Sequence, residues 1–218
     1  LRLDCDGFDD SLGKALEESI SNIYKLNSLV VLLCNGHINY LSEDWVPPPQ
    51  LRRLAFRSKG SWFKTLPLWI NPSSLPLLSY LDIMLFEVRS EVIQLLGTLP
   101  ALVYLKIQNY SVFEGAHEVE APVLSSGAAL FPCATECRFH GIGAMPSMFP
   151  RGAAPRLKRL VFSFAAKWIS GENFDLGMRH LPSLQRVSVV VRKKEASDAE
   201  VAEAEDHPNR PVLEIGLW

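Results

Sequence analysis

One nine-residue pattern recurs along the whole chain and constrains its fold more than any other feature. In its clearest form it reads LPALVYLKI, from Leu99 to Ile107. It returns as LPLLSYLDI from Leu75 to Ile83 and as LPSLQRVSV from Leu181 to Val189. Looser copies are LNSLVVLLC (26–34), PPQLRRLAF (48–56), FPCATECRF (131–139), APRLKRLVF (154–162) and HPNRPVLEI (207–215). So many copies predict a stack of similar units rather than one irregular core.

The spacing of the copies supports this interpretation. The third leucine position of each copy is occupied in turn by Leu1, Leu32, Leu54, Leu81, Leu105, Cys137, Leu160, Val187 and Leu213. A proline stands five residues before most of these positions, as Pro49, Pro76, Pro100, Pro132, Pro155, Pro182 and Pro208, and only Asn27 interrupts the column. A period of about 20–29 residues with a core of L-x-x-L-x-L is typical of leucine-rich repeats.

The alternation within each copy predicts a short β-strand, because successive side chains of a strand point to opposite faces. The proline belongs just before the strand, since it has no N–H to donate to a sheet. One strand cannot bury its leucines alone, so the copies should stack into a solenoid. The predicted fold class is therefore an α/β leucine-rich-repeat solenoid, with a curved parallel sheet on the concave face and short helices and loops on the convex face.

We predict one domain over 1–218 with about nine irregular repeats. Its strands should lie near 1–3, 30–34, 52–56, 79–83, 103–107, 135–139, 158–162, 185–191 and 211–215. The leucines expected inside are Leu29, Leu32, Leu54, Leu78, Leu81, Leu102, Leu105, Leu157, Leu160 and Leu184. Apolar spacing also predicts helices over 10–24 and 90–99. The run over 192–205, basic at first and then acidic and alanine-rich, predicts a short exposed helix. Because the chain begins inside a repeat, we expect it to be a fragment of a longer protein.

Composition restricts the possible partners. The formal net charge is -2, so no general attraction to nucleic acid or anionic membranes is expected. The longest apolar run, near 29–34, is too short to span a bilayer. Four cysteines without framework spacing favour a reducing compartment.

Motifs for catalysis or cofactor binding are weak. GFDDSLGK, from Gly7 to Lys14, has the wrong glycine spacing for a phosphate-binding loop and lacks the following Ser or Thr. Cys133, Cys137 and His140 resemble part of a metal site, but alternation on a strand would separate Cys137 from His140. We therefore expect no enzymatic activity and no cofactor or metal in this segment.

The residues between the leucines should form the concave face and are the candidate protein-binding surface. Exposed Tyr and Arg side chains are typical of such surfaces. The candidates are Arg53, Arg57, Tyr80, Asp82, Tyr104, Lys106, Gln108, Glu136, Arg138, His140 and Arg159. Two alternatives stay open: the charges could simply pair across strands, or the long insertion over 114–127 could carry the binding site.

The second half of the chain, from about Phe131 to Trp218, carries a more specific resemblance. GAAPRLKRLVFSF, FDLGMRHLPSLQRVSVVV, EASDAEVAEAE and DHPNRPVLEI resemble the end of the repeat domains of cereal coiled-coil nucleotide-binding disease-resistance proteins. The resemblance implies a cytoplasmic plant immune receptor whose repeats recognise a pathogen effector or a guarded host protein. It also implies contact with an upstream nucleotide-binding domain, where the only nucleotide would bind.

A different class of binding module also fits the repeats. The repeat portion of an F-box-type ubiquitin-ligase adaptor would have the same strands and the same exposed residues between the leucines. Both classes predict a binding module without catalysis, and the sequence upstream of Leu1 would distinguish them.

Overall fold

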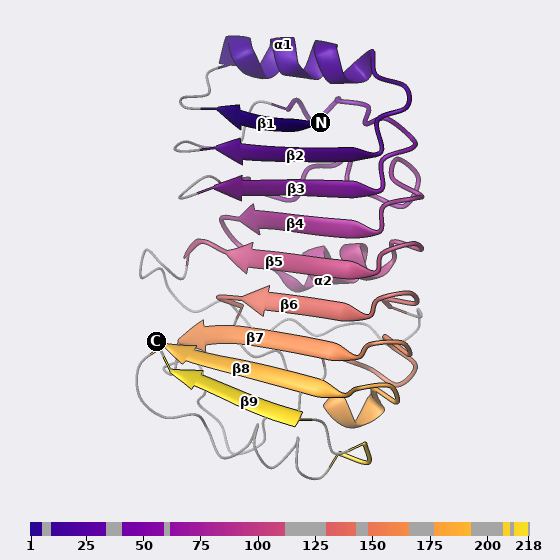
Figure 1. The fold of residues 1–218 in the computed structure, drawn as a ribbon, viewed down its shortest axis with the longest axis vertical. Helices are drawn as coiled ribbons and strands as arrows, with labels where there is room; N and C mark the ends of the chain where they lie inside the picture. Colours follow the sequence, from indigo (N-terminus) through magenta and orange to yellow (C-terminus); the bar gives the residue numbers. More distant parts are fainter. Residues whose placement is uncertain are drawn as a thin grey trace.

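A computed structural model describes residues 1–5, 10–33, 41–58, 62–111, 130–142, 148–165, 177–192, 207–209 and 212–217. Within these ranges, nine parallel strands form one sheet in sequence order (Figure 1). The strands are β1 (Arg2–Cys5), β2 (Ser28–Leu33), β3 (Arg53–Ser58), β4 (Tyr80–Leu85), β5 (Tyr104–Asn109), β6 (Glu136–His140), β7 (Arg159–Ala165), β8 (Arg186–Arg192) and β9 (Val212–Leu217). The predicted fold class, a leucine-rich-repeat solenoid, is confirmed.

The proline column marks a reverse turn that precedes most strands. In LPAL, the N–H of Leu102 donates to the carbonyl oxygen of Leu99 at 3.5 Å, and Pro100 occupies the second position of the turn. The same bond joins the equivalent residues in six copies, for example Leu157 to Ala154 at 3.0 Å and Leu184 to Leu181 at 3.2 Å. Proline favours the second position of such turns because its φ is already set there.

The second copy lies in a different register from the one we predicted. Leu29, not Leu32, pairs with Leu54 of β3, and Val31 pairs with Phe56. Leu29 and Val31 are buried, whereas Leu32 is only partly buried and shares a face with Arg57. The turn confirms the shift, because the N–H of Leu26 donates to the Ile23 carbonyl oxygen at 3.0 Å. The predicted register of this copy was therefore wrong by three residues, and so was the prediction that Leu32 lies inside.

The remaining predicted core leucines are all fully buried in one continuous hydrophobic cluster. They are joined by aromatic side chains, among them Phe139 and Phe162, whose rings stack at 5.6 Å. Two helices flank the sheet: α1 (Asp10–Ser21) lies beyond β1 at the N-terminal end, and α2 (Ser90–Gly97) lies in the connection between β4 and β5 (Figure 1). A 3-10 turn, η3 (Met178–His180), precedes β8.

Helix α2 begins at Ser90 as predicted. Ile93 and Leu96 face the core, whereas Leu95 is 37% exposed. The helix predicted over 192–205 lies outside the described residues except for its first residue, Arg192, which belongs to β8.

Candidate functional site

Strand alternation places the eleven predicted residues on the face of the sheet that is turned away from the core, here called the open face. In β5, Leu105 and Ile107 are buried while Tyr104, Lys106 and Gln108 are partly exposed. The strands are in direct register, so equivalent residues form rows across the sheet: Tyr80 pairs with Tyr104, and Asp82 with Lys106. Strands of a sheet lie about 4.8 Å apart, close enough for side chains in one row to touch.

Three residues of one row, Arg53, Tyr80 and Tyr104, form a ladder of flat side chains together with Arg138 of the next row, here called the tyrosine ladder. The rings of Tyr80 and Tyr104 stack with centroids 4.3 Å apart and planes within 3°. The guanidinium of Arg53 lies 3.6 Å from the Tyr80 ring centroid, and that of Arg138 lies 5.7 Å from the Tyr104 centroid. Cations over aromatic rings are attracted by the ring quadrupole, so the ladder holds its own conformation before any ligand arrives.

The tyrosines are less exposed than predicted. Both were expected to point freely into solvent, but each is only partly exposed because its neighbours in the ladder cover its ring. Burial raises the pKa of Tyr104 to about 12, although the nearby Arg138 opposes the change. The Tyr104 hydroxyl therefore stays protonated at physiological pH and can donate a hydrogen bond.

The next row centres on Asp82, which is buried although its position alternates with the core. Only 1% of Asp82 is exposed. Arg57 donates from Nε to Asp82 Oδ2 at 2.9 Å and from its guanidinium to the Tyr80 hydroxyl at 2.9 Å. Lys106 Nζ lies 3.6 Å from Asp82 Oδ1. The two long cationic side chains cover the short carboxylate. Asp82 therefore holds these cations in place and is not itself accessible to a partner.

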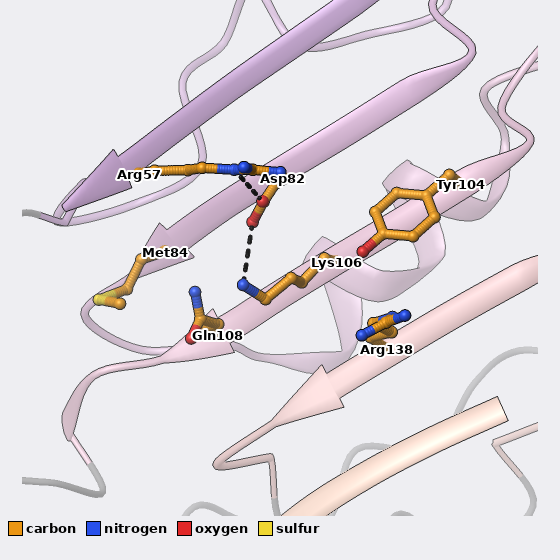
Figure 2. Close-up of a pocket in the computed structure, with 7 residues that line it drawn as sticks. All are labelled: Arg57, Asp82, Met84, Tyr104, Lys106, Gln108 and Arg138. Atoms are coloured by element: carbon orange, nitrogen blue, oxygen red, sulfur yellow. Dashed lines mark hydrogen bonds and ion pairs between the residues drawn. The ribbon is translucent and has the colours of Figure 1, made fainter. Parts of the chain in front are cut away.

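These side chains surround a hollow of about 430 Å³ on the open face (Figure 2). The hollow is lined by Arg57, Asp82, Met84, Tyr104, Lys106, Gln108 and Arg138. Six of these were predicted as site residues. Met84 was predicted to lie on the same face but not to belong to the site, and the alternation of β4 was the signal that could have included it.

The other predicted residues lie beside the hollow. Arg53 and Tyr80 belong to the tyrosine ladder, and Glu136 accepts a hydrogen bond from Arg138 Nε at 2.6 Å. Arg159 Nε lies 3.9 Å from the same Glu136 oxygen. His140 pairs with Gln108 and Ser163 in the third row. Cross-strand charge pairing, the alternative interpretation of these charges, therefore occurs on the same face as the aromatic ladder.

Within the described residues, no group of three His, Cys, Asp or Glu side chains is placed to hold a metal ion. Cys137 faces the core and is fully buried, which raises the pKa of its thiol, whereas His140 lies on the open face. The first three residues of the GFDDSLGK motif and the whole 114–127 insertion lie outside the described residues, and the last five residues of the motif form the start of α1. No helix in the described part of the chain is long and apolar enough to cross a membrane.

Comparison with known proteins identifies the repeat family. A family model described as "Leucine-rich repeat region" matches residues 1–213, which is nearly the whole chain. No curated protein matches the chain.

Proposed function

The chain belongs to the leucine-rich-repeat family, and on that premise we propose that its open face is the surface that recognises a protein ligand. Repeat domains of this kind are generally non-catalytic and bind proteins, using the extended surface that their stacked strands create. The observation that carries the proposal is the tyrosine ladder, which presents two stacked aromatic rings beside a hollow lined by cations. Tyr and Arg are the side chains most often found to dominate binding energy at protein interfaces.

We further propose that the ligand is a pathogen effector or a guarded host protein, and that the chain is the sensor and autoinhibitory repeat domain of a cytoplasmic plant immune receptor. The support is the resemblance of residues 131–218, above all the segments GAAPRLKRLVFSF and DHPNRPVLEI. An upstream nucleotide-binding domain would be a second, intramolecular partner. In the coding sequence upstream of Leu1, a nucleotide-binding loop would support the receptor, and an F-box would favour the ubiquitin-ligase adaptor instead.

Affinity capture from plant leaf extract tests the binding face. The chain is immobilised as wild type, as Tyr80→Ala/Tyr104→Ala, and as Glu91→Ala/Leu95→Ala, a control on the exposed side of α2. We expect captured proteins that are retained by the control and reduced at least tenfold by the tyrosine variant, since anchor residues typically contribute about 2 kcal/mol or more each. Circular dichroism checks that each variant is folded.

Capture that is unchanged in the tyrosine variant and lost when residues 114–127 are removed would place binding on the insertion. That result would overturn the proposal for the open face.

A further inference from the structure

The open face carries a local excess of positive charge in a chain whose formal net charge is -2. Among the described side chains on the open face of β3 to β8, the cations are Arg53, Arg57, Lys106, Arg138, Arg159 and Arg186, and the carboxylates are Asp82 and Glu136. Both carboxylates are already engaged by cations of the same face. A ligand that approaches the open face therefore meets a positive surface, which attracts opposite charge and opposes like charge.

The hollow concentrates hydrogen-bond donors around one point. Lys106 Nζ has three donor hydrogens, and its 3.6 Å separation from Asp82 Oδ1 is longer than a hydrogen bond. Toward the described residues, Arg57 uses two of its donor groups, on Asp82 and Tyr80. The Gln108 amide and the protonated hydroxyl of Tyr104 add two neutral groups that can donate. Lys106 and Gln108 project toward the same space (Figure 2).

Asp82, the carboxylate that lines the hollow, is covered by other side chains. Asp82 is 1% exposed and holds Arg57 and Lys106 in position, and these two cations outnumber its single negative charge. Its Oδ1 atom has no hydrogen-bond partner in the described part of the chain, and the Lys106 ammonium lies 3.6 Å from it. Asp82 thus holds both cations at the hollow before a ligand binds, which lowers the cost of ordering them.

From this geometry we propose that the hollow binds an Asp or Glu side chain of an acidic peptide segment in the protein ligand, and that the same segment lies across the tyrosine ladder. This inference rests on the proposed function of the open face. Charge-assisted hydrogen bonds from Arg57, Lys106 and Arg138 would hold the carboxylate. Met84 and the edges of the two tyrosine rings, whose faces are covered within the ladder, would contact the apolar parts of the segment. A peptide suits the face better than a nucleic acid, because one carboxylate needs only the cations of the hollow, whereas a nucleic acid needs many phosphate contacts.

The test uses a display library of random twelve-residue peptides as the probe and the full chain as the target. We expect the selected peptides to be enriched in Asp and Glu relative to the unselected library. Synthetic copies of them should bind at least tenfold more weakly to Lys106→Gln/Arg138→Gln. They should bind unchanged to Arg151→Gln/Arg156→Gln, which removes two exposed arginines from turns outside the sheet. Glutamine keeps most of the side-chain length, and circular dichroism checks that both variants are folded.

Four outcomes would overturn the inference in distinguishable ways. In the first, the selected peptides show no acidic enrichment, and their binding needs Tyr80 and Tyr104 but not Lys106 or Arg138. This would refute the acidic segment but would still support the open face as the binding surface. Acidic peptides that bind both glutamine variants equally would refute the hollow as their site. A twelve-nucleotide single-stranded DNA that binds through Lys106 and Arg138 more tightly than any selected peptide would refute a peptide ligand. Finally, peptides that depend on none of these four residues would refute both the inference and the proposed function.

Discussion

At the scale of single residues, the neighbours of a side chain decide its exposure as much as strand alternation does. Ala55 and Asp82 are both buried although they alternate with core positions. Long side chains on adjacent strands cover such short ones, as Arg57 of β3 and Lys106 of β5 do for Asp82. Arginine and lysine can do this because their aliphatic stems lie along the surface while their charges remain in water.

Tyr104 gives a prediction about pH. Its pKa is raised to about 12 by burial, whereas a tyrosine in the unfolded chain has a pKa of about 10. Between these values the folded chain keeps the proton and the unfolded chain loses it, so the free energy of unfolding should fall as the pH rises from about 10 to about 12. Urea unfolding at pH 8, 10 and 11 should show a smaller fall for Tyr104→Phe than for wild type.

A substitution at an exposed tyrosine provides the control for this measurement. Tyr24 is 77% exposed, so Tyr24→Phe should follow the wild-type pH dependence. If Tyr104→Phe also follows it, burial does not hold the proton on Tyr104.

At the scale of structural elements, the turns before the strands determine how each repeat begins. Gly177 has φ of 75° and leads into η3, and an added Cβ would clash with the carbonyl oxygen of Phe149. Gly152, in the turn before the previous strand, has a similar φ of 85° but open space around it. The two glycines therefore share the same backbone conformation and differ only in steric room.

Alanine substitutions at Gly152 and Gly177 separate the effect of backbone strain on stability from the effect of a steric clash. Gly152→Ala should lower the free energy of unfolding by about 1–2 kcal/mol, the cost of a left-handed conformation for a residue with a Cβ. Gly177→Ala should cost more, because the backbone of Phe149 must also move. Equal losses for the two variants in urea unfolding would show that the Gly177 site relaxes freely and would contradict the steric argument.

At the scale of the whole molecule, the sheet is a stack in which each strand pairs only with the next one along the chain. Leu81 and Leu105 are partners on adjacent strands, whereas Leu54 and Leu184 are separated by several repeats. All four are fully buried in the same cluster. In a repeat protein, stability approximates a sum of repeat and neighbour contributions.

Double-mutant cycles test this arrangement. Each single Leu→Ala substitution should cost about 2–5 kcal/mol as a truncation in the core. The losses for Leu54→Ala and Leu184→Ala should add to within about 0.5 kcal/mol, whereas those for Leu81→Ala and Leu105→Ala should deviate from additivity by about 0.5–3 kcal/mol. Val103→Ala, at a 40% exposed position, serves as a control and should change stability by less than about 0.5 kcal/mol. Strong coupling between the distant pair would contradict a stack of neighbour contacts.

The sequence by itself determined the solenoid, the parallel strands and the face on which each candidate residue lies. Strand alternation has a period of two, so leucines at alternate positions assign every side chain between them to the other face. The proline column likewise predicts where each strand begins, because proline favours a turn and cannot donate within a sheet.

The tertiary structure alone decided the register of the second copy and which side chains come together at the site. The segment from Leu26 to Leu33 is apolar at almost every position, so its own pattern fits either register, and pairing with β1 and β3 selects Leu29 over Leu32. The tyrosine ladder and the hollow depend on the direct register of β3 to β6, which places Tyr80 beside Tyr104 and Asp82 between two cations. The column of aligned leucines already predicts this register, since Leu54, Leu81, Leu105 and Cys137 pair in turn, but which side chains stack, pair and cover one another is decided only in the folded sheet.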